Sequence, residues 1–215
     1  MSAVHVGCTT DSVTPGLNMT RDPENQAGPR RPLLGLSALL SILSGCVSSE
    51  FLPLAENVDL NRIYGGWYLI ATIPNRFEKG LVQPYDVYSR RADGDIREDF
   101  YFRRGSVVAP QKHYTVHDWV KPGTHNAHWR VGLGPVNLPF LVLYVDPDYR
   151  YILFGERNRD LGWVYSRQPD ITDADLDMLM EHFRSVGYEP SRFRRFVQHR
   201  DQIGAPGFWS DRITP

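Results

Sequence analysis

Residues 65–73 read Gly-Gly-Trp-Tyr-Leu-Ile-Ala-Thr-Ile. Large apolar side chains recur at every second position from Trp67 onward, which is the period of a β-strand. The two glycines mark the point where the chain turns into the strand. We therefore predict a strand over Gly66–Ile73, with Trp67, Leu69, Ala71 and Ile73 on its inner face.

Further strand-like runs follow, about ten residues apart and separated by turn residues such as those at 92–94, 121–123 and 146–148. Short strands at this spacing are typical of an all-β sandwich or barrel. Together with the first strand, the count is eight. The later seven are predicted at residues 83–90, 95–104, 112–120, 126–133, 138–145, 149–155 and 162–167.

One amphipathic helix is predicted after the strands. Residues 170–187 carry apolar side chains at helical spacing, Thr172 and Asp175 resemble a capping box, and Gly187 ends the run. The strand at 138–145 is apolar on both faces, so one face needs a cover that this helix can provide.

Composition narrows the class of protein. The chain has 215 residues, of which 41% are hydrophobic, with a formal net charge of -1. A charge so close to neutrality gives no electrostatic basis for binding nucleic acid. Cys8 and Cys46 both precede the strands, so we expect no disulfide framework, thiol active site or zinc cluster within the folded part.

The N-terminal part has the pattern of an export signal. Arg30 and Arg31 precede an apolar run of 11 residues at 33–43, which is too short to span a bilayer. The following Leu-Ser-Gly-Cys ends at Cys46 and resembles the lipobox of bacterial lipoproteins, which implies acylation of that cysteine. Val47 in place of an aspartate implies sorting to the outer membrane. The basic pair lies far from Met1, so Met19 is an alternative start.

These features divide the chain into four parts. Residues 1–45 are an extension with a lipoprotein signal peptide, 46–57 a lipidated tether, 58–200 the folded domain and 201–215 a flexible tail.

Three motifs along residues 58–198 resemble the lipocalin family, and the branch of bacterial lipocalins and apolipoprotein D in particular. Gly65 and Trp67 match G-x-W on the first strand, Asp148 and Tyr149 match the turn before the seventh, and Arg167 ends the last strand. The resemblance implies an all-β fold, an eight-stranded antiparallel up-and-down barrel with one C-terminal helix packed outside. It also implies a hydrophobic ligand such as a fatty acid or lysophospholipid, stored or transported in the barrel.

Side chains can be given roles within such a barrel. Trp67 is expected to plug one end, with Arg167 over its indole ring as a cation–π pair. Parity then places Trp163 and Tyr165 inside as well. The candidate ligand-binding residues are Tyr88, Phe100, Trp119, Trp129, Leu143 and Trp163.

Catalysis and metal binding have weaker support. The sequence has no nucleophile elbow, phosphate-binding glycine loop or H-E-x-x-H helix, so we expect a binding protein without metal or cofactor rather than an enzyme. Two alternatives stay open: a barrel enzyme for a lipophilic substrate, with Glu98 as its acid, and haem binding through a histidine. The histidines in question are His113, His117, His125 and His128, interpreted first as surface or rim residues.

Predicted partners are a small hydrophobic ligand and the membrane, reached through the lipid anchor on the periplasmic face of the outer membrane. The sequence leaves the oligomeric state open, and a homodimer is one option.

Overall fold

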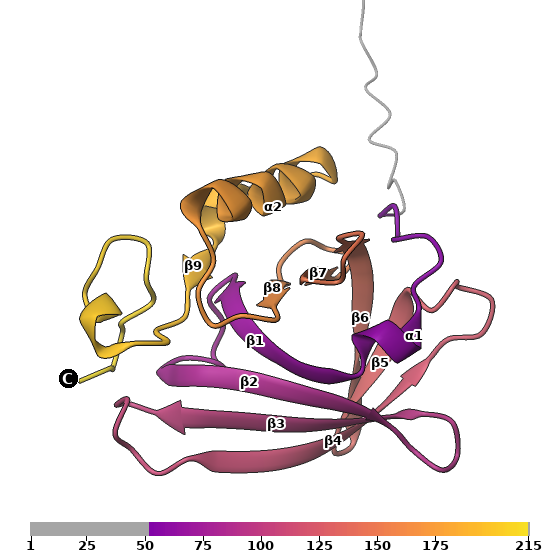
Figure 1. Cartoon of the computed structure of the whole chain (residues 1–215), viewed down its shortest axis with the longest axis horizontal. Coiled ribbons are helices and arrows are strands. Elements are labelled where there is room, and N and C mark those ends of the chain that lie inside the picture. Colours follow the sequence, from indigo (N-terminus) through magenta and orange to yellow (C-terminus); the bar gives the residue numbers. More distant parts are fainter. Residues whose placement is uncertain (1–51, 215) are drawn as a thin grey trace, which may run out of the picture. The chain divides into compact units, whose positions relative to one another are not determined.

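The computed structural model describes residues 52–214 (Figure 1). The predicted signal peptide, the alternative start at Met19 and the acylation site at Cys46 lie outside the described residues. The described residues 52–214 belong to one compact unit. Within the described range, no helix is long and apolar enough to cross a membrane.

Eight antiparallel strands close into a barrel, as the sequence predicts, and each strand begins and ends within two residues of its predicted bounds. The barrel closes because β1 pairs with β2 along its first half and with β8 along its second half. The strands are β1 Gly65–Thr72, β2 Leu81–Arg90, β3 Ile96–Arg104, β4 Lys112–Val120, β5 His128–Leu133, β6 Val136–Val145, β7 Tyr151–Gly155 and β8 Gly162–Ser166.

The predicted helix is α2, Asp173–Ser185, and it lies across the outside of the barrel (Figure 1). The hydroxyl of Thr172 accepts a hydrogen bond from the Asp175 amide at 3.0 Å, which caps the helix. Leu179 and Phe183 are fully buried and pack against outward-facing barrel residues such as Leu153. The helix therefore covers an apolar outer face, as the doubly apolar strand required.

The predicted inner face of β1 is wrong at its far end. Leu69 contributes to the barrel interior, but Ala71 and Ile73 belong to the cluster beneath α2. The pairing of β1 with β8 shifts between Leu69 and Ala71. This irregularity shifts the inward–outward alternation by one residue, so Ala71 and Ile73 point outward instead of inward.

The C-terminal segment is packed rather than flexible. After the 3₁₀ turn Pro190–Arg192, a short strand β9, Arg194–Arg195, pairs with the end of β1, and a second turn follows at Arg200–Gln202. Ile213 is buried against Val82, and the Thr214 amide donates to the Gly105 carbonyl at 2.7 Å. The prediction of a loose tail is therefore wrong for the residues described up to 214.

Candidate functional site

One end of the barrel is closed by residues that precede β1. The helix α1, Leu60–Ile63, places buried Ile63 against the interior core, and the indole of Trp67 donates to the Ile63 carbonyl at 2.7 Å. The guanidinium of Arg167 lies 3.7 Å from the centre of the Trp67 ring. The predicted plug and its cation–π partner thus form the closed end.

Arg167 also binds the backbone of this end. Its guanidinium donates to the Gly66 carbonyl at 2.8 Å and the Arg62 carbonyl at 2.6 Å. Gly65 has φ +100°, which favours glycine, and a Cβ at Gly66 would lie 1.6 Å from the Tyr85 hydroxyl oxygen. The glycine pair therefore lets the chain pass beneath Arg167 and Tyr85.

The turn between β6 and β7 supports the same end. Tyr149 accepts a hydrogen bond from the Asp59 amide at 2.8 Å, and the Arg62 guanidinium lies 4.1 Å from its ring centre. The acid that organises this turn is Asp146, which is buried and accepts from the Tyr151 amide at 2.9 Å. Asp148, the residue predicted from the motif, is exposed.

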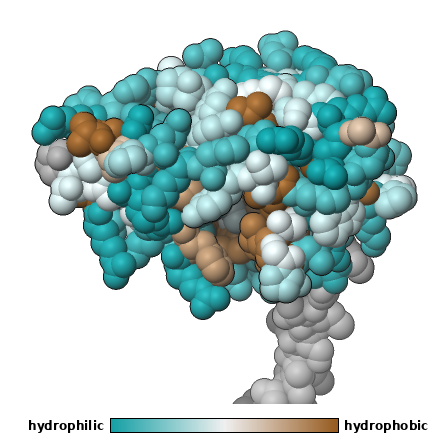
Figure 2. Space-filling view, turned by 90° about the horizontal axis from the view of Figure 1, so that it is seen from below, coloured by the Kyte–Doolittle hydropathy of each residue, from teal (hydrophilic) through white to brown (hydrophobic). Residues whose placement is uncertain are grey.

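The opposite end opens into a cavity of about 200 Å³. Its walls are mainly apolar and aromatic side chains of the inner face, and its mouth lies at the ends of β1, β3 and β5. Figure 2 shows hydrophobic residues around a recess on an otherwise mostly hydrophilic face. The lining includes Leu69, Leu81, Phe100, Phe102, Val116, Val131, Leu138, Phe140, Trp163 and Tyr165, with Phe77, Arg104, Tyr114 and Leu133 toward the mouth.

Two of the six candidate ligand-binding residues, Phe100 and Trp163, line this cavity. Tyr88 and Trp129 are buried in the interior beyond it, with 5.5 Å between their ring centres in an edge-to-face pair. These two side chains fill the barrel toward its closed end. Whether any of the four contacts a ligand stays a prediction.

The other two candidates point away from the interior. Trp119 lies on the outer face of β4 beside the exposed His117, with 5.7 Å between their ring centres. Leu143 packs against the cluster under α2, while its neighbour Val142 belongs to the interior core. The strand parity assigned from hydropathy is therefore wrong at both positions.

A line of buried carboxyl groups crosses the interior, and Glu98 is the one member that the sequence analysis names. Asp86, Glu98 and Asp118 lie on the inner faces of β2, β3 and β4. Asp86 is in register with Phe100, and Asp118 with Ile96, so successive acids lie nearer the closed end. Asp86 and Glu98 line the cavity, and Asp118 lies deeper.

Burial of these three acids makes their ionised forms unfavourable. Among residues 52–214, no hydrogen bond of ordinary length and angle reaches a carboxyl oxygen of Asp86 or Asp118. Tyr165 and Glu98 lie beside Asp86. Glu98 and the Gly132 backbone lie beside Asp118. Burial, followed by the charge of Glu98, raises the pKa of Asp86 well above its usual range and the pKa of Asp118 to about 11. Burial also raises the pKa of Glu98. Desolvation therefore favours the neutral carboxyl groups.

A fourth acid, Glu78, sits near the mouth and is hydrogen-bonded. It accepts from the Trp163 indole at 2.7 Å and from the Asn75 amide group at 2.6 Å. Burial raises its pKa, which these hydrogen bonds partly offset. Glu78 therefore holds the Trp163 ring in position along the cavity wall.

Strand parity could have found the missed acids. Asp86 is two residues from Tyr88, and Asp118 is two residues from Val116, which faces inward. The predicted inward residue of β4 is Trp119, but the inward side chain at this point is that of Asp118. Burial of apolar residues is a one-way tendency, so hydropathy alone cannot identify an inward-facing acid.

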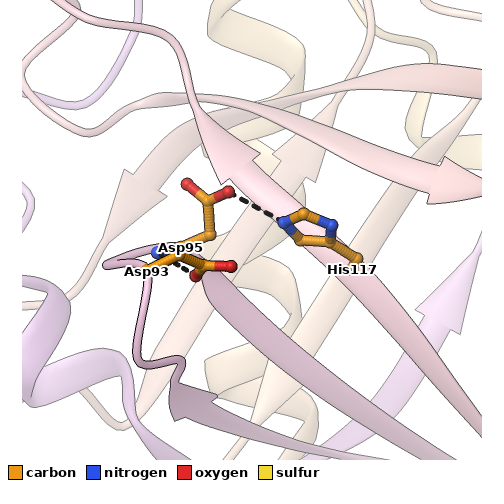
Figure 3. A group of neighbouring side chains, drawn as sticks. All are labelled: Asp93, Asp95 and His117. Atoms are coloured by element: carbon orange, nitrogen blue, oxygen red, sulfur yellow. Dashed lines mark hydrogen bonds and ion pairs between the residues drawn. The ribbon is translucent and has the colours of Figure 1, made fainter.

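The histidines do not line the cavity. His113 and His117 lie on the outer face of β4, where their Nε2 atoms contact Asp99 at 2.9 Å and Asp95 at 2.8 Å. His117 also lies near Asp93 and Asp95 at the exposed β2–β3 turn (Figure 3). Among residues 52–214, no histidine side chain faces the interior of the barrel where haem would be held.

Comparison with known proteins finds a lipocalin family model and related sequences. The family model described as a lipocalin-like domain matches residues 58–198. The outer membrane lipoprotein Blc of Escherichia coli K12 is 27% identical over 170 residues, covering 75% of this chain and 93% of the relative. Temperature-induced lipocalin-1 of Arabidopsis thaliana is 27% identical over 159 residues, covering 68% and 83%.

Solved structures agree on the fold. Insecticyanin from the tobacco hornworm Manduca sexta superimposes with a TM-score of 0.56 at 15% identity, covering 71% of this chain and 87% of that one. Apocrustacyanin C1 gives a TM-score of 0.53 at 16% identity, with coverage of 66% and 80%. These similarities concern the arrangement of strands.

Proposed function

The chain belongs to the lipocalin-like domain family, and from this premise we propose that it is a lipid-anchored carrier that holds one small hydrophobic ligand in its barrel. The supporting observation is the asymmetry of the barrel. Trp67 and Arg167 close one end, while the other opens into a mainly apolar cavity of about 200 Å³. Each ligand CH₂ buried there contributes about 0.8 kcal/mol.

The proposed ligand class is an amphiphile with an acyl or alkyl chain, including fatty acids and lysophospholipids. The chain would lie along Phe100, Phe140 and Trp163. An anionic headgroup would stay at the mouth, where the exposed Arg104 is the basic residue of the lining. In this proposal the protein acts by binding, in storage or transport, rather than by catalysis.

The proposed location is the periplasmic face of the outer membrane. The Leu-Ser-Gly-Cys motif ending at Cys46 supports acylation, and the printed name of the Blc relatives supports the outer membrane. Two or more acyl chains are needed for stable anchoring, because a single chain binds membranes only marginally. A Cys46→Ser variant should move to the soluble fraction, and its retention in membranes would contradict the anchor.

Ligand binding is tested on residues 48–215, which form a separate compact unit with its own core. Native mass spectrometry and lipid extraction should reveal a bound amphiphile. Added decanoate should also quench fluorescence from Trp163. A Trp163→Phe variant, compared with Trp119→Phe on the outer face, assigns the quenching to the cavity. An empty protein that leaves its tryptophan fluorescence unchanged would refute the carrier.

A further inference from the structure

The acidic side chains in the cavity wall limit which ligand headgroups can bind there. A buried carboxyl group normally has a hydrogen-bond or charge partner, because an unpaired one costs several kcal/mol. Asp86 is fully buried and lines the cavity, and no hydrogen bond of ordinary length and angle reaches its oxygens among the described residues, although Tyr165 and Glu98 lie beside it. Glu98, in the same wall, adds a second carboxyl group facing the same space. The pair is suited to accept hydrogen bonds from a ligand.

The protein offers these acids no cation of its own along the cavity. Arg104 is the one basic residue among the described lining residues, and it lies on the strand that carries Glu98. It is four residues beyond Phe100, the register partner of Asp86, which is roughly 13 Å along a strand. Its guanidinium is also bound to the Phe77 carbonyl at 3.2 Å. A positive charge at the acids must therefore come from the ligand.

We propose that the cavity binds an amphiphile with a primary ammonium group, whose nitrogen lies between the carboxyl groups of Asp86 and Glu98 while its alkyl chain extends toward the mouth. This inference rests on the proposed function, because it assumes that the barrel holds an amphiphile. An ammonium group has three donors and no acceptor, so it can donate to the oxygens of both carboxyl groups at once. Charge-assisted hydrogen bonds of this kind are about twice as strong as neutral ones.

Binding moves one proton. The ammonium group takes its place beside a carboxyl group that gives its proton to solvent, and the resulting carboxylate is neutralised by the ligand. An alcohol can donate only one hydrogen bond and leaves both carboxyl groups neutral. A carboxylate ligand brings a like charge toward the acids, so its headgroup stays at the mouth. The titratable groups that surround this position are Glu78, Asp86, Tyr88, Glu98, Asp118 and Tyr165, with Arg104 at the mouth.

The test compares three ligands with the same ten-carbon chain on residues 48–215. Isothermal titration at pH 7.5 measures the binding of decylamine, decan-1-ol and decanoate. Decylamine should bind about tenfold more tightly than decan-1-ol, since a hydrogen bond to a charged group contributes about 1.5–3 kcal/mol. Asp86→Asn combined with Glu98→Gln should remove that preference and leave the affinity for decan-1-ol within about twofold.

A matched control separates the site from net charge. Glu181→Gln removes a negative charge from the exposed face of α2 and should leave all three affinities unchanged. The single variant Asp86→Asn, checked for cooperative unfolding, serves if the double variant does not fold. Equal binding of decylamine and decan-1-ol, or an amine preference that is undiminished in Asp86→Asn, would overturn the ammonium site while the carrier stands. Failure of all three ligands to bind would overturn both.

Discussion

The two ends of the barrel interior bury polar groups in opposite ways. At the closed end, the guanidinium of Arg167 stacks on Trp67 and donates to the backbone carbonyls of Gly66 and Arg62. Beside the cavity, Asp86 and Asp118 are fully buried, and no hydrogen bond of ordinary length and angle reaches their carboxyl oxygens among residues 52–214. A satisfied polar network stabilises the fold, whereas an unsatisfied one destabilises it unless a ligand completes it. The closed end is therefore structural, and the line of acids is the better candidate for ligand recognition.

The largest effect is expected from removing the plug at the closed end. Trp67→Ala should lower the free energy of unfolding by about 3–5 kcal/mol, because it leaves a cavity and removes the indole hydrogen bond to the Ile63 carbonyl. Urea denaturation measures this loss. Trp119→Ala, on the outer face, is the control and should cost much less. Equal losses in the two variants would contradict the structural role of the closed end.

Replacing a buried acid should instead raise the free energy of unfolding, by an amount that depends on pH. The raised pKa of Asp118 keeps its carboxyl group neutral in the folded protein, while the unfolded chain ionises above about pH 4. The unfolded state thus binds fewer protons, and stability falls as pH rises above 4, by up to about 1.4 kcal/mol per pH unit. Asp118→Asn removes the part of this dependence that comes from Asp118, while Asp86 and Glu98, whose pKa values are also raised, keep theirs.

Thermal unfolding between pH 5 and pH 8 tests the prediction. The advantage of Asp118→Asn over the parent protein should increase across this range and shrink toward pH 4. Asp148→Asn is the matched control, because Asp148 is exposed. A variant that is less stable than the parent at pH 8 would show that the Asp118 carboxylate is satisfied in the folded protein.

A smaller effect is expected from Arg167→Lys. Lysine keeps the charge but cannot donate in a planar fork while stacking on the indole ring. The free energy of unfolding should fall by about 1–2 kcal/mol, because the variant loses the cation–π contact and some of the hydrogen bonds of the guanidinium. Urea denaturation at low and high salt measures it. A loss that disappears at high salt would indicate that screened electrostatic attraction of the cation, rather than the stacking and hydrogen-bond geometry at Trp67, is responsible.

The smallest effect is expected at the mouth. Arg104→Gln should weaken decanoate binding by about threefold, because the charged pair there is exposed to water and therefore contributes less than 1 kcal/mol. Binding of decan-1-ol should not change. A similar loss for both ligands would mean that Arg104 shapes the mouth instead of attracting an anionic headgroup.

The sequence predicts the fold and the closed end well because both depend on local patterns. Short strands between turn residues define the barrel, and the helix at 173–185 is set by apolar spacing and the Thr172 cap. The pairing of Trp67 with Arg167 follows from the family motifs. The cavity lining is harder to predict. Leu143 lies at a register shift between β6 and β7, which resets the alternation of inward positions. Trp119 lies on a strand with a continuous register, where an inward acid replaces the apolar residue that hydropathy favours.

The sequence by itself therefore determined the class of protein, the number of strands, the outer helix and the structural role of Arg167. Only the tertiary structure decided that Ala71 and Leu143 face α2, and that Asp86 and Asp118 join Glu98 along the cavity. The physical reason is that the fold depends on the summed burial of many apolar side chains, which hydropathy records. A ligand site depends on a few polar groups buried against that trend, and their position is defined only when the strands meet.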